Sequence, residues 1–140
     1  MQTRELSRSD RPSVIDLWER CSLTRRWNPP EADFDRAENG STSAVLGMFD
    51  SDALVAAVMV GDDGHRGWIY YLAVDPAHQR RGLGRAMMKT AESWLVERGV
   101  RKVELMVRSS NHDVEDFYEA VGYKPEDVRV LSRWLVEVPT

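Results

Sequence analysis

The sequence has little of what several common protein classes require. Its 140 residues include one cysteine, Cys21, so no disulfide can form within the chain. The three histidines, at positions 65, 78 and 112, lack the paired spacing that is typical of metal ligands. We therefore expect a protein that contains neither a disulfide nor a metal ion.

Charge and hydropathy argue against two further classes of function. The chain carries 19 basic and 23 acidic residues, which gives a net charge of −4. No overall positive field is therefore available to hold a nucleic acid or an anionic membrane. The N-terminus has no apolar leader, and no apolar run reaches the ~18 residues that a membrane-spanning helix needs. We expect a soluble cytoplasmic protein that binds neither nucleic acid nor membrane.

Length and periodicity predict one domain, residues 1–140, of the α/β class. We expect strands near residues 2–6, 42–49, 53–61, 68–74 and 102–108, and one or two closing strands within 128–138. We expect helices near residues 10–21, 31–39, 83–98 and 112–120. The unbroken apolar run at residues 68–74 indicates a strand that is buried on both faces.

Arginines and glycines alternate in the segment that follows this strand. Residues 79–85 read Gln-Arg-Arg-Gly-Leu-Gly-Arg and lie where a strand leads into a helix. A helix N-terminus leaves its first N–H groups unpaired and carries about half a positive charge. Gly82 and Gly84 would let an anion approach these groups. The pattern alone fits a surface arginine cluster equally well, and it matches neither the dinucleotide-binding fingerprint nor the P-loop.

Two segments together resemble one family. "LAVDPAHQRRGLGRAMM" at residues 72–88 resembles motif A of the GNAT (Gcn5-related N-acetyltransferase) superfamily, whose Q/R-x-x-G-x-G/A loop binds the pyrophosphate of acetyl-CoA. "NHDVEDFYEAVGY" at residues 111–123 resembles the N-x-x-A-x-x-h-Y-E-x-x-G-F/Y segment of the same family, with Val114 replacing the usual alanine. The resemblance is specific over about residues 68–123 and is greatest to the small bacterial YpeA-like acetyltransferases.

The resemblance implies a fold and an activity. It implies a mixed, mostly antiparallel sheet of about six to seven strands, flanked by about four helices, with the fourth and fifth strands splayed at a bulge. It implies direct transfer of an acetyl group from acetyl-CoA to a primary amine, either on a small molecule or on a protein N-terminus or lysine. The sequence leaves the acceptor and the oligomeric state open, with a homodimer as one option.

The resemblance also assigns roles to residues. Tyr118 corresponds to the general acid that protonates the departing thiolate, although a core tyrosine would fit the same pattern. Asn111 corresponds to a cofactor ligand, and it would serve equally as a helix N-cap. The other residues that correspond to acetyl-CoA ligands are Leu72, Ala73, Val74, Gln79, Arg80, Arg81, Gly82, Leu83, Gly84 and Arg85. Within this set, the Val74 N–H corresponds to the donor that polarises the acetyl carbonyl.

The general base has no clear candidate. Relatives that resemble the ribosomal-protein N-terminal acetyltransferases carry a glutamate five residues before the motif asparagine, and here that position is Met106. Glu104 and His65 are weaker candidates for the general base, and a structural or solvated role would explain the presence of either residue. A non-catalytic acyl-CoA-binding module therefore remains an alternative. Acceptor binding could involve Trp27 together with Glu31, Asp33 and Asp35. Trp27 would equally pack the turn, and the three acids would equally form a solvated helix face.

Overall fold

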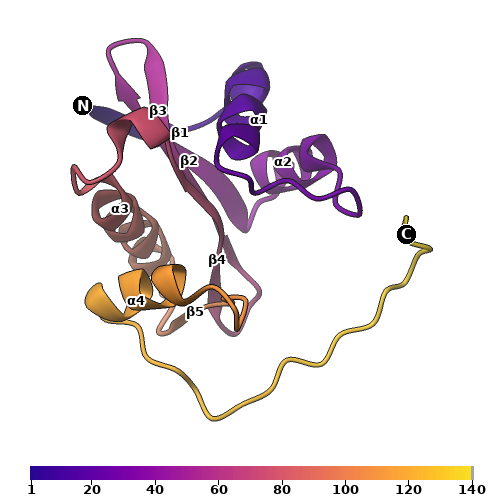
Figure 1. The fold of residues 1–140 in the computed structure, drawn as a ribbon. Coiled ribbons are helices and arrows are strands. Elements are labelled where there is room, and N and C mark those ends of the chain that lie inside the picture. Colours follow the sequence, from indigo (N-terminus) through magenta and orange to yellow (C-terminus); the bar gives the residue numbers. More distant parts are fainter. Residues whose placement is uncertain (140) are drawn as a thin grey trace. The chain divides into compact units, whose positions relative to one another are not determined.

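The computed structural model describes residues 1–139, in two parts that are taken separately, residues 1–105 and 106–139. The first part contains all the strands and three of the α-helices (Figure 1). Its elements, in chain order, are β1 (Gln2–Glu5), η1 (Arg8–Asp10), α1 (Arg11–Arg20), α2 (Pro30–Asn39), β2 (Ser43–Asp50), β3 (Ala53–Asp62), β4 (Gly67–Val74), η2 (Pro76–His78), α3 (Leu83–Glu97) and β5 (Val103–Leu105). The second part contains α4 (His112–Ala120).

The strands form one sheet in the order β1-β2-β3-β4-β5. Neighbouring strands are antiparallel except for β4 and β5, which are parallel. This confirms the predicted α/β fold with a mixed, mostly antiparallel sheet. Short turns join the antiparallel pairs β2–β3 and β3–β4, α1 and α2 lie between β1 and β2, and the helix α3 makes the parallel crossover from β4 to β5.

Within residues 1–139 the sheet has five strands, so the expected six or seven are too many. Residues 128–138, which alternate as a strand would, form no strand. β-propensity favours an extended chain, but a strand exists only where a neighbour completes its hydrogen-bond ladder. Within residues 106–139, taken by themselves, there is no other strand for this segment to pair with.

β4 and β5 differ from expectation in detail. β5 covers Val103–Leu105 instead of residues 102–108, and its pairing with β4 ends at Ile69 opposite Leu105. Among the described residues, no strand pairs with Tyr70–Val74 on that side, which agrees with the expected splaying of the fourth and fifth strands. β4 is not buried on both faces, because the side chain of Tyr70 is 43% exposed.

Helices cover both faces of the sheet, with α1 and α2 on one side and α3 on the other (Figure 1). Trp18 of α1 and Phe34 of α2 are fully buried in the core of the first face. Met87 and Met88 supply the equivalent core residues of α3. A Cβ on Gly67 would lie 2.7 Å from a methyl group of Leu95, so α3 packs closely against the start of β4.

Truncating the core side of α3 should destabilise the protein far more than truncating its exposed side. Met87 is fully buried, so Met87→Ala should lower the free energy of unfolding by about 2–5 kcal/mol through lost contacts and a cavity. Val96 lies on the same helix and is 70% exposed, so Val96→Ala should change it by less than ~0.5 kcal/mol. Urea unfolding of both variants checks this, and equal losses would contradict the packing described.

Candidate functional site

A break in the β3–β4 ladder shapes the second half of β4. The register shifts between Ala57 and Met59, where two residues of β4 lie opposite one of β3. Tyr71, at this bulge, has a φ of 53°, a left-handed conformation that is uncommon for residues other than glycine. Such strain persists only where surrounding contacts hold it in place.

The side chain of Tyr71 makes the contacts that hold the bulge. Its ring stacks on Trp18 of α1, with centroids 3.9 Å apart and planes 14° from parallel. Its hydroxyl donates a hydrogen bond to Asp33 of α2 at 2.7 Å. Burial, followed by the Asp33 carboxylate, raises the pKa of Tyr71, so the phenol keeps its proton. Both N-terminal helices are thereby joined to the bulge.

Beyond the bulge, the register determines where the backbone of Val74 points. The Asp75 N–H bonds to the Val55 carbonyl of β3 at 2.8 Å, while Val74 lies opposite Ala56. Because hydrogen-bonded and non-hydrogen-bonded pairs alternate in an antiparallel ladder, Val74 occupies a non-hydrogen-bonded position. Its N–H therefore points away from β3, toward the side on which Tyr70–Val74 has no partner strand among the described residues.

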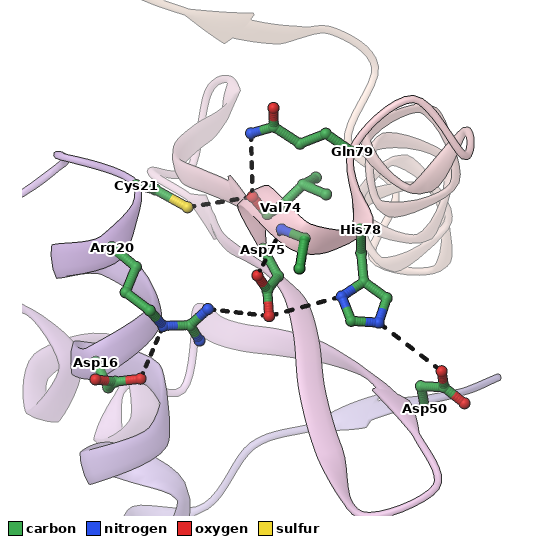
Figure 2. A network of polar contacts seen from close by, with 9 residues as sticks. Asp16, Arg20, Cys21, Asp50, Val74, Asp75, His78 and Gln79 are labelled. Carbon is green, nitrogen blue, oxygen red and sulfur yellow. Dashed lines mark hydrogen bonds and ion pairs between the residues drawn. The ribbon is translucent and has the colours of Figure 1, made fainter.

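The chain leaves β4 through Asp75, which is the N-cap of η2. The Asp75 carboxylate accepts a hydrogen bond from the Ala77 N–H at 2.9 Å and forms an ion pair with Arg20 of α1 at 2.9 Å (Figure 2). The Ala77 N–H and then Arg20 lower the pKa of Asp75, so the carboxylate is ionised at neutral pH. The ring of His78 lies beside it, with Nδ1 3.6 Å from the carboxylate.

The loop that follows combines two left-handed residues with an uncapped helix. Arg80 has a φ of 65° and Gly82, the N-cap of α3, has a φ of 77°. A Cβ on Gly82 would meet nothing within 4 Å, so this position needs glycine for its backbone conformation and not to avoid crowding. Among the described residues, the Leu83 and Gly84 N–H groups have no acceptor, and Gly82 provides no side-chain cap.

The charge around this N-terminus is the reverse of the usual arrangement. Helices commonly place acidic residues in the first turn, where they interact favourably with the dipole. The first turn of α3 has none and contains Arg85 instead. Arg80, Arg81 and Arg85 are all exposed on the surface. Unpaired N–H groups, a glycine and exposed cations fit the binding of an anionic group such as a pyrophosphate.

The structure places most of the predicted ligands in one continuous stretch. Leu72, Ala73 and Val74 end β4, and residues 79–85 form the loop and the first turn of α3. Leu83 is buried, so only its backbone N–H could reach a ligand. Asn111 and Tyr118 belong to the separately described part, residues 106–139.

Tyr118 lies on α4, between two other aromatic rings. Its ring makes edge contacts with Phe117 and Tyr123, at centroid distances of 5.1 Å and 5.9 Å. Burial raises the pKa of Tyr118 to about 12. The hydroxyl therefore keeps its proton throughout the physiological pH range, as a general acid must.

Asn111 is the N-cap of α4. Its side-chain oxygen accepts a hydrogen bond from the Val114 N–H at 3.3 Å, while Asp113 and Glu115 lie in the first turn. This confirms that Asn111 caps the helix. Its correspondence to a cofactor ligand stays a prediction.

None of the weak candidates for a general base occupies a prepared site. Glu104 of β5 pairs with Arg66 at 3.5 Å, and His65 lies exposed in the turn before β4. Met106 is 51% exposed.

Within residues 1–139 no group of three or more potential ligands could hold a metal ion. In the same range, no helix has the length and apolar character needed to span a membrane.

Four residues of this region have roles that are not indicated by the sequence analysis. Tyr71 carries no signal in the sequence, because nothing local marks a non-glycine residue for a positive φ. Asp33 accepts a hydrogen bond from Tyr71, and Asp35 pairs with Arg11 at 2.7 Å, so neither belongs to a merely solvated helix face. Asp75 caps η2, and its signal in the sequence is an aspartate that directly precedes a proline.

Comparison with known proteins agrees with this geometry. The family model described as "Acetyltransferase (GNAT) family" matches residues 4–123. Acetyltransferase YE1169 of Yersinia enterocolitica is 40% identical over 136 residues, which cover 97% of this chain and 96% of that protein.

Solved structures show the same fold. The structure of AAC(6')-Iy in complex with the bisubstrate analogue CoA-S-monomethyl-acetylneamine has a TM-score of 0.82 at 12% identity, covering 96% of this chain and 98% of that one. The ribosomal-protein-S18-alanine N-acetyltransferase from Escherichia coli has a TM-score of 0.75 at 26% identity, covering 86% of this chain and 76% of that one.

Replacing Gly82 should affect stability and anion binding, whereas replacing a matched glycine should affect stability alone. Gly64, in the turn before β4, also has a positive φ and open space around it. Gly82→Ala and Gly64→Ala should each cost about 1 kcal/mol of strain. Only Gly82→Ala should weaken the binding of inorganic pyrophosphate, measured by calorimetry. Equal pyrophosphate affinities in the two variants would argue against an anion site at α3.

Proposed function

The chain belongs to the acetyltransferase (GNAT) family and is an acetyl-CoA-dependent N-acetyltransferase; we propose that it acetylates a primary amine of a small molecule or a protein by direct attack. The observation that carries this proposal is the uncapped N-terminus of α3, with Gly82 in the left-handed conformation and arginines around it. Acetyl-CoA supplies the acyl group as an activated thioester. The tasks left to the protein are to bind, to orient and to move protons.

We assign binding to the loop and orientation to β4. The N–H groups at the start of α3, with Arg80, Arg81 and Arg85, would hold the pyrophosphate. Leu72, Ala73 and Val74 would border the cofactor along the side of β4 that has no partner strand among the described residues, and Asn111 would add a contact to the cofactor arm. The Val74 N–H, directed away from β3, would then act on the acetyl carbonyl as an oxyanion donor does.

Tyr118 is our proposed general acid. Its side chain is partly buried, and its pKa is raised to about 12, so the hydroxyl holds a proton that it can give to the sulfur of the leaving group. The conjugate acid of the departing thiolate has an ordinary pKa near ~8.5, so the sulfur takes up a proton at neutral pH, and Tyr118 would supply that proton as the bond breaks. The alternative is an acyl-CoA-binding module without turnover, which the Met106 position favours and the retained Tyr118 opposes.

The acceptor is proposed to be an amine of low pKa. Deprotonating a lysine of pKa ~10.4 at pH 7 costs about 4.6 kcal/mol, whereas an α-amine near ~7.8 costs about 1.1 kcal/mol. A site without a positioned base tolerates the second more easily. The similar structures include a ribosomal-protein-S18-alanine N-acetyltransferase and an aminoglycoside acetyltransferase. These acceptor classes make a useful first panel.

Removing the Tyr118 hydroxyl should reduce turnover without preventing acetyl-CoA binding. We expect Tyr118→Phe to lower kcat by about a hundredfold, as loss of a general acid does, and to leave the Kd for acetyl-CoA within twofold. The assay is thiol release across N-terminal peptides, lysine peptides and aminoglycosides.

Phe117→Leu, which alters the neighbouring ring, serves as the control and should retain most of kcat. Because the pKa of Tyr118 is raised, wild-type kcat should show no decline from loss of this proton below about pH 10. If Tyr118→Phe turns over normally, this residue has no part in the chemistry. If the wild type releases no thiol with any amine, the binding-module alternative is favoured.

We further propose that the chain forms a homodimer through its C-terminal segment, defined as residues 126–138. This segment exposes most of its large apolar side chains: Val128 72%, Val130 66%, Leu131 91%, Trp134 53%, Leu135 90% and Val136 69%. So much exposed apolar surface in one stretch typically marks an interaction site. The alternating pattern suits a strand, and the occupant we propose is a sheet edge of a second copy.

Light scattering during size-exclusion chromatography checks this proposal. We expect the wild type to have twice the mass of one chain. Leu131→Asp combined with Leu135→Asp should give the mass of one chain, because two charges would enter the proposed interface. Val96→Asp, on the exposed face of α3, should leave the dimer intact. A wild type with the mass of one chain at micromolar concentration would rule the dimer out.

A further inference from the structure

The start of the loop between β4 and α3, residues 76–82, is held by a chain of polar contacts that neither the family pattern nor the proposed chemistry uses. It runs from Asp16 and Arg20 on α1, through Asp75, to His78 and Asp50 (Figure 2). All these residues lie in the part formed by residues 1–105. The short contacts are concentrated at Asp75, whereas those of His78 are 3.6 Å and 3.9 Å long.

Asp75 uses both carboxylate oxygens, each for a different task. Oδ1 accepts the Ala77 N–H and so fixes the first turn of η2. Oδ2 forms the ion pair with Nη1 of Arg20, a residue of α1 that lies 55 positions earlier in the chain. The side chain is only 16% exposed, and charge-assisted hydrogen bonds are the stronger kind. Asp75 therefore joins the loop to α1.

Arg20 is itself held in position. Its Nε donates to Asp16, one turn earlier in α1, at 2.9 Å, and its Nη1 is left to Asp75. The next residue, Cys21, donates its thiol to the Val74 carbonyl at 3.3 Å. The end of α1 thus contacts two successive residues, Val74 and Asp75, where the chain leaves the sheet.

The loop has reason to depend on these contacts. Between Asp75 and the buried Leu83, the chain passes through left-handed conformations at Arg80 and Gly82. The one at Arg80 is unfavourable for a residue with a Cβ and must be imposed from outside the loop. Residues 79–82 are exposed, so fixed ends are the main means of imposing it.

We infer that Asp75, held by Arg20, is a positioning residue for acetyl-CoA: the ion pair sets the path of residues 76–82 and so presents the start of α3 to the pyrophosphate. This inference rests on the proposed pyrophosphate site at α3. Asp75 itself touches neither the cofactor nor the reacting atoms. Losing the pair therefore raises the Kd and KM for acetyl-CoA and leaves kcat at saturation nearly unchanged.

The chain offers a closely matched control. Arg4 and Asp10 form a second ion pair at 2.8 Å, with side-chain exposures of 47% and 14% against 39% and 16% for Arg20 and Asp75. Asp10 also accepts a backbone N–H, that of Ser7, as Asp75 accepts that of Ala77. The two aspartates therefore have equivalent structural roles, but only Asp75 borders the loop.

The test compares Asp75→Ala with Asp10→Ala, and Arg20→Gln with Arg4→Gln. Calorimetry with acetyl-CoA should show about a tenfold increase in Kd for the Asp75 and Arg20 variants, equivalent to ~1.4 kcal/mol, and less than twofold for the controls. Melting temperatures should fall similarly within each matched pair. In the protein without ligand, hydrogen exchange at residues 77–84 should quicken only in the Asp75 and Arg20 variants.

The double variant Arg20→Gln with Asp75→Ala separates a pair from two independent residues. If they act together, its Kd should match that of the worse single variant, because the second change removes nothing further. Arg20→Lys, which keeps a cation, should recover part of the affinity. Unchanged Kd values in all Asp75 and Arg20 variants, with acetyl-CoA binding to the wild type, would overturn this inference alone. A wild type that does not bind acetyl-CoA would instead overturn the pyrophosphate site.

Discussion

Where β3 and β4 lose their regular register, opposite Val58, Tyr71 takes a left-handed conformation and its side chain packs on Trp18 and bonds to Asp33. The features that follow in the chain depend on this constraint. β4 has already separated from β5 at Ile69, and the bulge reorients the strand so that the Val74 N–H points away from β3. A regular β4 paired along its whole length would have used that N–H in a ladder.

The proposed anion site is compatible with the acidic character of the whole chain. The net charge of −4 gives no general attraction for phosphate. At the start of α3, however, unpaired N–H groups, the helix dipole and three exposed arginines act over a few ångströms. The Asp75 carboxylate at the loop entrance is paired with Arg20 and the Ala77 N–H, so its charge is balanced locally.

Local patterns in the sequence were enough to predict most elements. α4 was expected at residues 112–120 and is found there, because Asn111 and Gly122 mark its ends chemically. α3 begins at Leu83 as expected, since its apolar spacing starts there. The loop residues were predicted to be acetyl-CoA ligands from the family motif, and that role stays a prediction.

Contacts between residues far apart in the chain determine the features that local sequence patterns could not predict. The pairing of Arg20 with Asp75 joins residues far apart in the chain, and a positive φ at Tyr71 has no local signature. Residues 128–138 have the composition of a strand but no partner strand within residues 106–139, so the strand that β-propensity predicts there is not formed. The roles of Tyr118, Asn111 and the loop residues remain predictions that binding and kinetic measurements can test.

The position of Cys21 bears on the order of chemical events. Its thiol is half-buried, donates to the Val74 carbonyl, and has a pKa raised by that burial, so little of it is ionised at neutral pH. It is the sole sulfhydryl of the chain. A double-displacement route through an acylated cysteine therefore has no activated nucleophile among the described residues, which supports the direct attack proposed above, with donor and acceptor bound to the protein at the same time.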